Sequence, residues 1–201
     1  MVYDLQYFFE EGGRVIQVYT GEGKGKTTAA LGLALRAAGQ GCSVRIIQFM
    51  KGNRYTGEIA SAYRLGIEIF QCGEKCSCPE EVFSEGSKCS GHPESWNKKG
   101  GRSTLDQECF KKGWRLAQET IHEEQHHLLI LDEFIYGLNY GWMELEVLLN
   151  WLEKLPPEPE VVLTGRNAPV PLQETAHLVS EINKVKHYFD SGIKARQGIE
   201  Y

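Results

Sequence analysis

A glycine-rich segment, TGEGKGKTT at residues 20–28, restricts the possible folds of this chain more than any other stretch. The apolar run before it, residues 15–19, predicts a buried β-strand, and the alanine- and leucine-rich residues 26–38 predict a helix. Glycines at positions 21, 23 and 25 allow the backbone to adopt positive φ and to turn its N–H groups inward. The first turn of the helix adds unpaired N–H groups and the positive end of the helix dipole. Strand, glycine loop and helix together predict a phosphate-binding site.

The side chains of this segment predict a nucleoside triphosphate as the ligand. Lys26 can neutralise phosphate charge, and the hydroxyl of Thr27 or Thr28 is placed to ligate a magnesium ion bound to the phosphates. The usual pattern has a glycine five positions before the Gly-Lys pair, where this chain has Thr20, so the loop is one residue short. The residues expected to contact ATP are Gly21, Glu22, Gly23, Lys24, Gly25, Lys26, Thr27 and Thr28.

Two later segments predict the rest of such a site. Residues 127–131 are apolar and lead directly into Asp132 and Glu133. A carboxylate at the end of a neighbouring buried strand can hold the magnesium ion, directly or through water, and we expect Asp132 or Glu133 to do so. Residues 160–163 predict a strand that enters a Thr-Gly-Arg turn, where Arg166 either contacts a phosphate or the ribose of ATP or is an ordinary surface arginine.

Strand and helix patterns alternate along the chain, which predicts an α/β fold with a mostly parallel sheet and helices on both faces, of the P-loop NTPase or RecA-like type. Further strands are predicted at 43–49, 67–70 and 178–182, helices at 58–65, 103–122, 143–155 and 172–177, and an aromatic loop at 134–142. We expect a single domain over residues 1–201, with a cysteine-rich insertion at about 71–101, where periodicity is lost.

The composition narrows the partners and the compartment. The net charge is −5 with acidic and basic residues interspersed, so neither nucleic acid nor an anionic membrane is an expected partner. No apolar stretch approaches the roughly 20 residues that span a bilayer, and residues 1–11 lack the layout of a signal peptide. A site for ATP in a chain with six cysteines fits a compartment that keeps thiols reduced, so we expect a cytoplasmic protein.

Taken together, several segments resemble the ATP:corrinoid adenosyltransferases of the housekeeping, P-loop type. The similar segments are residues 20–28, 48–52, 129–133, 164–166 and the tail 185–201. The tail is the most specific of them, because generic P-loop chemistry does not require it. The resemblance implies transfer of the 5′-deoxyadenosyl group of ATP to Co(I) of a reduced corrinoid, with release of triphosphate. ATP, Mg²⁺ and the corrinoid would then be the small molecules of the reaction.

The resemblance also implies roles for residues and partners. Catalysis would depend on Lys26, Thr27, Asp132 and Glu133, which stabilise the leaving triphosphate, and no protein nucleophile is needed. Family members act as homodimers and depend on a reductase such as a flavodoxin. An N-terminal arm, here the aromatic residues 3–9, helps to cover the corrinoid. The family also places a Phe and a Trp on a mid-chain loop to hold the corrinoid four-coordinate, and either Phe83 or Trp96 could serve here.

The cysteine-rich segment departs from that family pattern. It contains Cys72-x3-Cys76-x-Cys78 followed by Cys89-x2-His92. Three or four soft ligands in a long irregular segment could hold zinc or an iron–sulfur cluster and so order the loop. The alternative is a set of reduced thiols in a mobile loop.

Two other functions compete with adenosyl transfer. A nucleoside kinase of the thymidine-kinase type also combines a P-loop core with a cysteine-rich, zinc-holding loop, but it would release ADP. A non-catalytic carrier would bind ATP and corrinoid without turnover. The tail and the turn at residues 164–166 favour the transferase over the kinase.

Overall fold

The computed structural model describes residues 15–52, 56–73, 104–123 and 125–200. These residues build a six-stranded, fully parallel sheet with the strand order β3-β2-β4-β5-β1-β6. The strands are β1 (Ile16–Thr20), β2 (Val44–Phe49), β3 (Glu68–Cys72), β4 (Leu128–Asp132), β5 (Glu160–Thr164) and β6 (Leu178–Glu181). The predicted α/β class with a parallel sheet is confirmed, and strand boundaries differ from the prediction by one or two residues.

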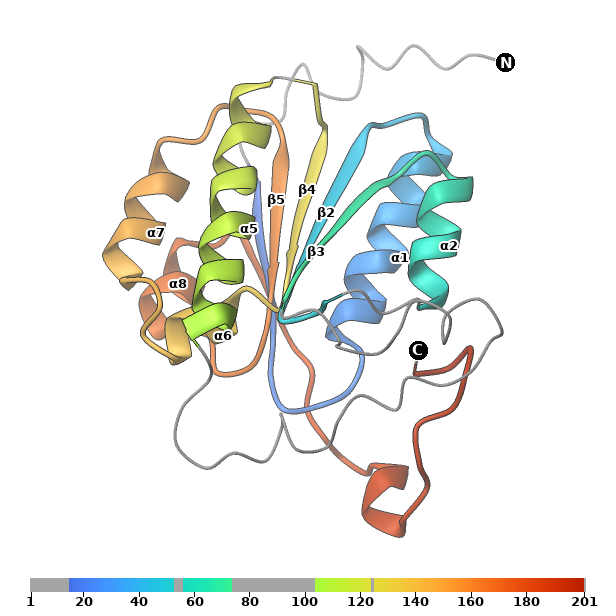
Figure 1. Ribbon diagram of the computed structural model, residues 1–201. Helices are drawn as coiled ribbons and strands as arrows, with labels where there is room; N and C mark the ends of the chain where they lie inside the picture. Colours follow the sequence, from blue (N-terminus) through green and yellow to red (C-terminus); the bar gives the residue numbers. More distant parts are fainter. Residues whose placement is uncertain (1–14, 53–55, 74–103, 124, 201) are drawn as a thin grey trace.

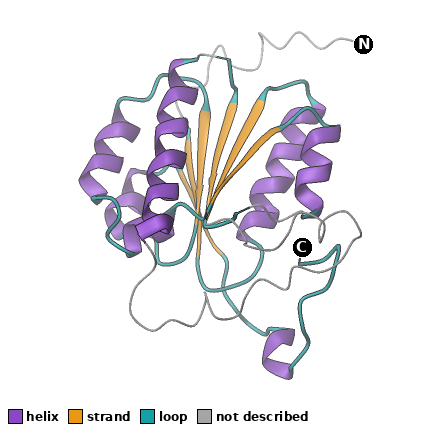
Figure 2. Cartoon of the chain, viewed as in Figure 1, coloured by secondary structure: helices purple, strands orange, loops and turns teal. Residues whose placement is uncertain are grey.

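Helices cover both faces of the sheet (Figures 1 and 2). One face carries α1 (Lys26–Gly39) and α2 (Gly57–Arg64), and the other carries α5 (Thr104–His122), α6 (Ile135–Asn139), α7 (Leu145–Glu153) and α8 (Val170–Thr175). This arrangement follows from the sequence of parallel strands, because each crossover must return to the starting edge of the sheet through a helix. No helix of the described segments is both long and apolar enough to cross a membrane.

The prediction of an aromatic loop over residues 134–142 is wrong, because residues 135–139 form the short helix α6. Glycine at position 137 hid the helical pattern in the sequence. In the structure this glycine is required by packing, since a Cβ atom there would lie 2.1 Å from the ring of Phe110. The helix therefore forms against α5 through a close tertiary contact that local sequence preferences do not contain.

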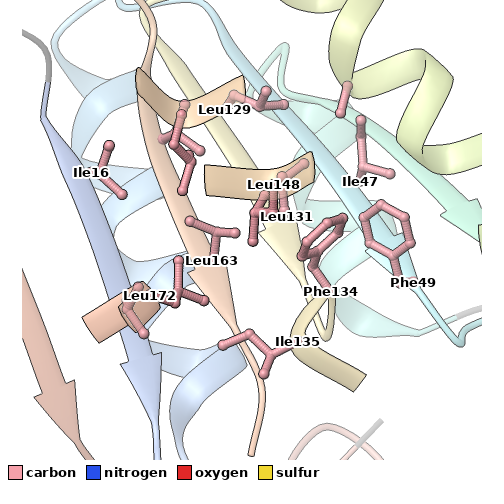
Figure 3. Close-up of a cluster of buried hydrophobic side chains, with 14 of the residues drawn as sticks. Ile16, Ile47, Phe49, Leu129, Leu131, Phe134, Ile135, Leu148, Leu163 and Leu172 are labelled. Carbon is pink, nitrogen blue, oxygen red and sulfur yellow. The ribbon is translucent and has the colours of Figure 1, made fainter. Parts of the chain in front are cut away.

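The larger of two apolar cores lies between the sheet and the α5–α8 layer (Figure 3). Its centre is a triangle of phenylalanine rings from β2, from α5 and from the residue that precedes α6: Phe49, Phe110 and Phe134. Their ring centroids are 5.1–5.2 Å apart. The second core packs α1 and α2 on the opposite face through alanine and branched aliphatic side chains. The sheet is thus buried on both sides, as its near-continuous apolar strands require.

Three neighbouring strands end in the same unusual way at the carboxyl edge of the sheet. The residue directly after each strand has a positive φ: 62° for Met50 after β2, 61° for Glu133 after β4 and 152° for Gly165 after β5. Positive φ is costly for residues other than glycine, so these turns are held by their surroundings. Each turn bends the chain sharply at the end of its strand and brings the residues around it to one edge.

Candidate active site

The glycine loop lies at this carboxyl edge and binds its own lysine. Nζ of Lys26 donates hydrogen bonds to the carbonyl oxygens of Gly21 at 2.7 Å and Gly23 at 2.8 Å. Gly21 and Gly25 have positive φ values of 99° and 128°, as predicted. Burial lowers the pKa of the Lys26 ammonium, and the nearby Arg166 lowers it further. The ammonium is therefore held inside the loop, where a bound phosphate chain would lie.

Gly23 is required for a different reason from the predicted one. Its φ is not among the positive values that mark Gly21 and Gly25. Instead, a Cβ atom at this position would lie 2.6 Å from the carbonyl oxygen of Ile182, to which the N–H of Gly23 donates a hydrogen bond. The glycine loop thus packs directly on the chain that leaves β6. A side chain at position 23 would push these two segments apart.

Asp132 lies beside the first turn of α1, as the strand pattern predicted. The hydroxyl of Thr27 donates to Oδ1 of Asp132 at 2.8 Å, and the hydroxyl of Thr164 donates to the same oxygen at 2.8 Å. Asp132 is almost fully buried. Of the two threonines considered for the metal, Thr27 is the one hydrogen-bonded to Asp132. Hydroxyl and carboxylate oxygens are the ligands that Mg²⁺ prefers, so the residues present fit this ion.

Glu133 turns away from this pair. Its backbone N–H donates to the hydroxyl of Thr164 at 2.8 Å, and its side chain lines the adjacent cavity. Thr28 lines the same cavity from α1. The structure therefore brings one of the two candidate carboxylates to Thr27 and places the other on the wall of the cavity.

A cavity of about 1000 Å³ opens in front of these residues. The glycine loop and α1 form one wall, α2 and the end of β2 a second, and the C-terminal tail a third. The tail, described as far as residue 200, contributes Phe189, Ile193 and Ile199, whose side chains are exposed. Charged groups and apolar surface thus face one space, which suits a ligand with a polyanionic part and a large apolar part.

The family model for "ATP:corrinoid adenosyltransferase BtuR/CobO/CobP" matches residues 13–201. The chain belongs to this family. It is 34% identical to the corrinoid adenosyltransferase of Escherichia coli strain K12 over 187 residues, which cover 93% of this chain and 85% of that protein. It is 33% identical to the corrinoid adenosyltransferase of Pseudomonas aeruginosa, with 93% and 83% covered. The corrinoid adenosyltransferase CobA of Salmonella typhimurium is also 33% identical, with 96% and 87% covered. These matches give no support to the kinase alternative.

Family membership accounts for the tail, whose contacts with the glycine loop could not be predicted from the sequence. Glu200 accepts hydrogen bonds from the hydroxyl of Tyr188 and from the backbone N–H and guanidinium of Arg196. Nζ of Lys24, in the glycine loop, lies 3.7 Å from the same carboxylate. The short 3-10 helix η2 (Tyr188–Ser191) lies within the part of the tail that these contacts of Glu200 hold together. The tail therefore folds back onto the phosphate-binding segment.

Arg166 and Glu22 form an ion pair at 2.8 Å across the mouth of the cavity. Both side chains are about half exposed, at 47% and 55%, and both line the cavity. The structure thus places Arg166 on the wall of the candidate site instead of elsewhere on the surface. Its guanidinium is already held by a carboxylate of the glycine loop, so binding a phosphate would require it to share or exchange this partner.

The predicted metal site at the cysteines is described only in part. Cys72 lies at the end of β3, and burial, together with the neighbouring Cys109, raises the pKa of its thiol to about 11. Within residues 15–52, 56–73, 104–123 and 125–200, no three histidine, cysteine or acidic side chains are grouped to hold a metal. Cys76, Cys78, Cys89 and His92 lie outside the described residues, as do Phe83 and Trp96.

The contacts of Glu200 predict an unusual acid titration. Hydrogen bonds from Arg196 and then Tyr188 lower the pKa of this carboxyl group from 4.5 to about 2. Because the folded-state pKa is depressed, the stabilisation is present above the unfolded-state pKa and is lost as the pH falls towards 2. We expect an NMR titration to show the Glu200 carboxyl ionising near pH 2, with the amide of Arg196 reporting the same transition. In a Glu200→Gln variant the Arg196 amide should lose that transition. Ionisation of Glu200 near 4.5 in the wild-type protein would contradict the observed contacts.

Proposed function

We propose that this chain transfers the 5′-deoxyadenosyl group of ATP to Co(I) of a reduced corrinoid. An electron pair of Co(I) forms the bond to the 5′ carbon, while the bond from that carbon to the triphosphate oxygen breaks and its electrons leave with the triphosphate. The observation that carries this proposal is the cavity itself. The phosphate-binding loop, including Thr27 with its hydrogen bond to Asp132, and the C-terminal tail line one space.

The roles of the loop residues follow from the charge that develops during this reaction. Negative charge grows on the leaving triphosphate, so donors that are already oriented stabilise the transition state more than the ground state. We assign this role to Lys26 and to the backbone N–H groups of residues 21–28 other than Gly23, whose N–H already donates to Ile182. Glu22, Lys24 and Arg166 would border the phosphates from the mouth of the cavity, where they already form ion pairs.

The metal-binding role is assigned to Thr27 and Asp132, with Glu133 facing the same cavity. Magnesium, when bound, would supply positive charge to the phosphate oxygens. The hydroxyl of Thr164 and the amide of Gln48 also donate to Asp132, at 2.8 and 3.3 Å, and hold its carboxylate in one orientation. These two residues are not apparent from the glycine motif, although Gln48 and Thr164 belong to the segments 48–52 and 164–166 that resemble the family.

The remaining components of the proposal concern partners. The corrinoid would occupy the part of the cavity bordered by the apolar side chains of the tail. A homodimer and an electron-donating reductase such as a flavodoxin are proposed from the family resemblance, and a cytoplasmic location is proposed from the ATP site and the six cysteines. A structural zinc or iron–sulfur site at the cysteines, a corrinoid contact by Phe83 or Trp96, and a cover formed by residues 3–9 stay predictions.

The test is an anaerobic incubation of the protein with ATP, Mg²⁺ and chemically reduced cob(I)alamin, followed by the visible spectrum and by analysis of the phosphate product. We expect adenosylcobalamin and intact triphosphate in equal amounts. Release of ADP with phosphorylation of an added nucleoside would instead establish a kinase. Binding of both ligands without turnover under excess corrinoid would establish a carrier.

A further inference from the structure

We propose that Lys51 is a second lysine of the triphosphate site, which binds the phosphate chain from the wall formed by α2 and the end of β2. This inference rests on the proposed function, since it concerns the same triphosphate. The sequence placed Lys51 in a segment that resembles the family but attached no role to it. Its position, its contacts and its charge each point to the phosphates.

The backbone is bent to bring Lys51 to the cavity. Met50, directly before it, has a φ of 62°, a conformation that costs free energy for a residue with a side chain. The N–H of Met50 donates to the carbonyl of Cys72 at 3.0 Å, which ties this turn to the end of β3. A Cβ atom at Gly73 would lie 2.7 Å from the backbone of Lys51, so a glycine is needed there. The ends of β2 and β3 thus pack closely against each other at Lys51.

The contacts of the ammonium place it beside the candidate metal ligands. Nζ of Lys51 lies 3.2 Å from Oδ2 of Asp132, while the hydroxyl of Thr27 donates to Oδ1 of the same carboxylate. The ammonium and the threonine hydroxyl therefore contact the two oxygens of one side chain. Lys51 lines the cavity together with Lys26 and Thr27, and 23% of its side chain is exposed there. A triphosphate held by Lys26 and Thr27 would lie within reach of both lysines.

The charge balance explains why a second cation is needed. Glu58 lies 3.4 Å from Nζ of Lys51, so three carboxylates, Asp132, Glu58 and Glu133, surround the ammonium. The ammonium of Lys51 offsets part of this negative charge through its ion pairs with Asp132 and Glu58. Without the Lys51 ammonium, these carboxylates would repel an approaching polyphosphate, and little positive charge would remain on that wall of the cavity to offset the repulsion.

The first experiment measures binding without any turnover. In the absence of corrinoid no acceptor is present, so calorimetry can follow the binding of ATP and of inorganic triphosphate at equilibrium, both with Mg²⁺ and with EDTA. We expect Lys51→Met to weaken both ligands by about tenfold or more under either condition, the effect of removing a charged hydrogen-bond donor. Lys51→Arg should recover most of the affinity. Lys154→Met is the matched control, because Lys154 is exposed and ends α7 at the opposite edge of the sheet.

A second measurement uses the wild-type protein and so does not depend on the folding of a variant. Amine acetylation followed by mass spectrometry reports the accessibility of each lysine, and we expect triphosphate in EDTA to protect Lys51 and Lys26 but not Lys154. Unchanged labelling of Lys51 together with unchanged affinity in Lys51→Met would overturn the inference and leave Lys51 as a structural partner of Asp132. If the wild-type protein binds triphosphate and fails only to make adenosylcobalamin, the proposed function fails while this inference stands.

Discussion

Replacing Lys26 by methionine is expected to lower kcat/KM for ATP in adenosyl transfer by about a hundredfold or more. The ammonium lies within the glycine loop, and its removal leaves the growing charge of the leaving triphosphate without the cation that is fixed in this loop. Methionine has similar length and its apolar stem fits a half-buried position, so the fold should be retained. The measurement is the initial rate of adenosylcobalamin formation at several ATP concentrations, under saturating cob(I)alamin.

The control for this variant is again Lys154→Met, which should keep the wild-type rate. Thermal unfolding of Lys26→Met should occur close to the wild-type temperature, because Lys26 donates its two hydrogen bonds to carbonyl groups of a single loop. A loss of less than about tenfold would show that backbone N–H groups and other cations carry the leaving-group stabilisation, and the assignment of Lys26 would then be wrong.

Replacing Phe110 by alanine is expected to lower the free energy of unfolding by about 3–5 kcal/mol. Phe110 is 2% exposed and its ring packs on Phe49, on Phe134 and on Trp142, at a centroid distance of 5.8 Å in the last case. Its ring also fills the space that Gly137 leaves for it. The alanine variant would leave a large cavity between α5, α6 and the sheet, which these rigid elements cannot close. Chemical denaturation monitored by circular dichroism gives the value.

Leu105→Ala provides the matched control for this second variant. Leu105 lies on the same helix as Phe110 but is 44% exposed, so its truncation should change the free energy of unfolding by about 0.5 kcal/mol or less. Equal losses in the two variants would contradict the placement of Phe110 at the centre of the larger core.

Most of the fold was predictable because its signals are local. The apolar run and glycine spacing of residues 15–28 predicted β1, the loop and α1, and the apolar run ending at Asp132 predicted β4. Strand–helix alternation was sufficient for the parallel α/β class. The short helix α6 was missed because it forms only against Phe110, and five residues containing a glycine carry no clear period.

The sequence predicted which types of residue form the candidate site, but it did not predict which of these residues contact each other. The choice of Thr27 over Thr28, and the separate positions of Asp132 and Glu133, depend on the direction in which α1 and the end of β4 meet. The contact of Gly23 with Ile182 and the ion pair of Lys51 with Asp132 were not visible, because each joins segments that are far apart in the chain. The apolar pattern within one segment carries no information about which distant segment it will contact.

The sequence by itself therefore determined the elements, the phosphate-binding loop and the family of this protein. These depend on spacings of a few residues, which set backbone geometry directly. Tertiary structure alone decided which side chains share the cavity. Thr27 and Asp132 are 105 residues apart, and they meet because the strand order places only β5 between β4 and β1, with the carboxyl ends of all three strands at one edge. That order results from packing both faces of the sheet at once, a condition on the whole chain and not on any single segment.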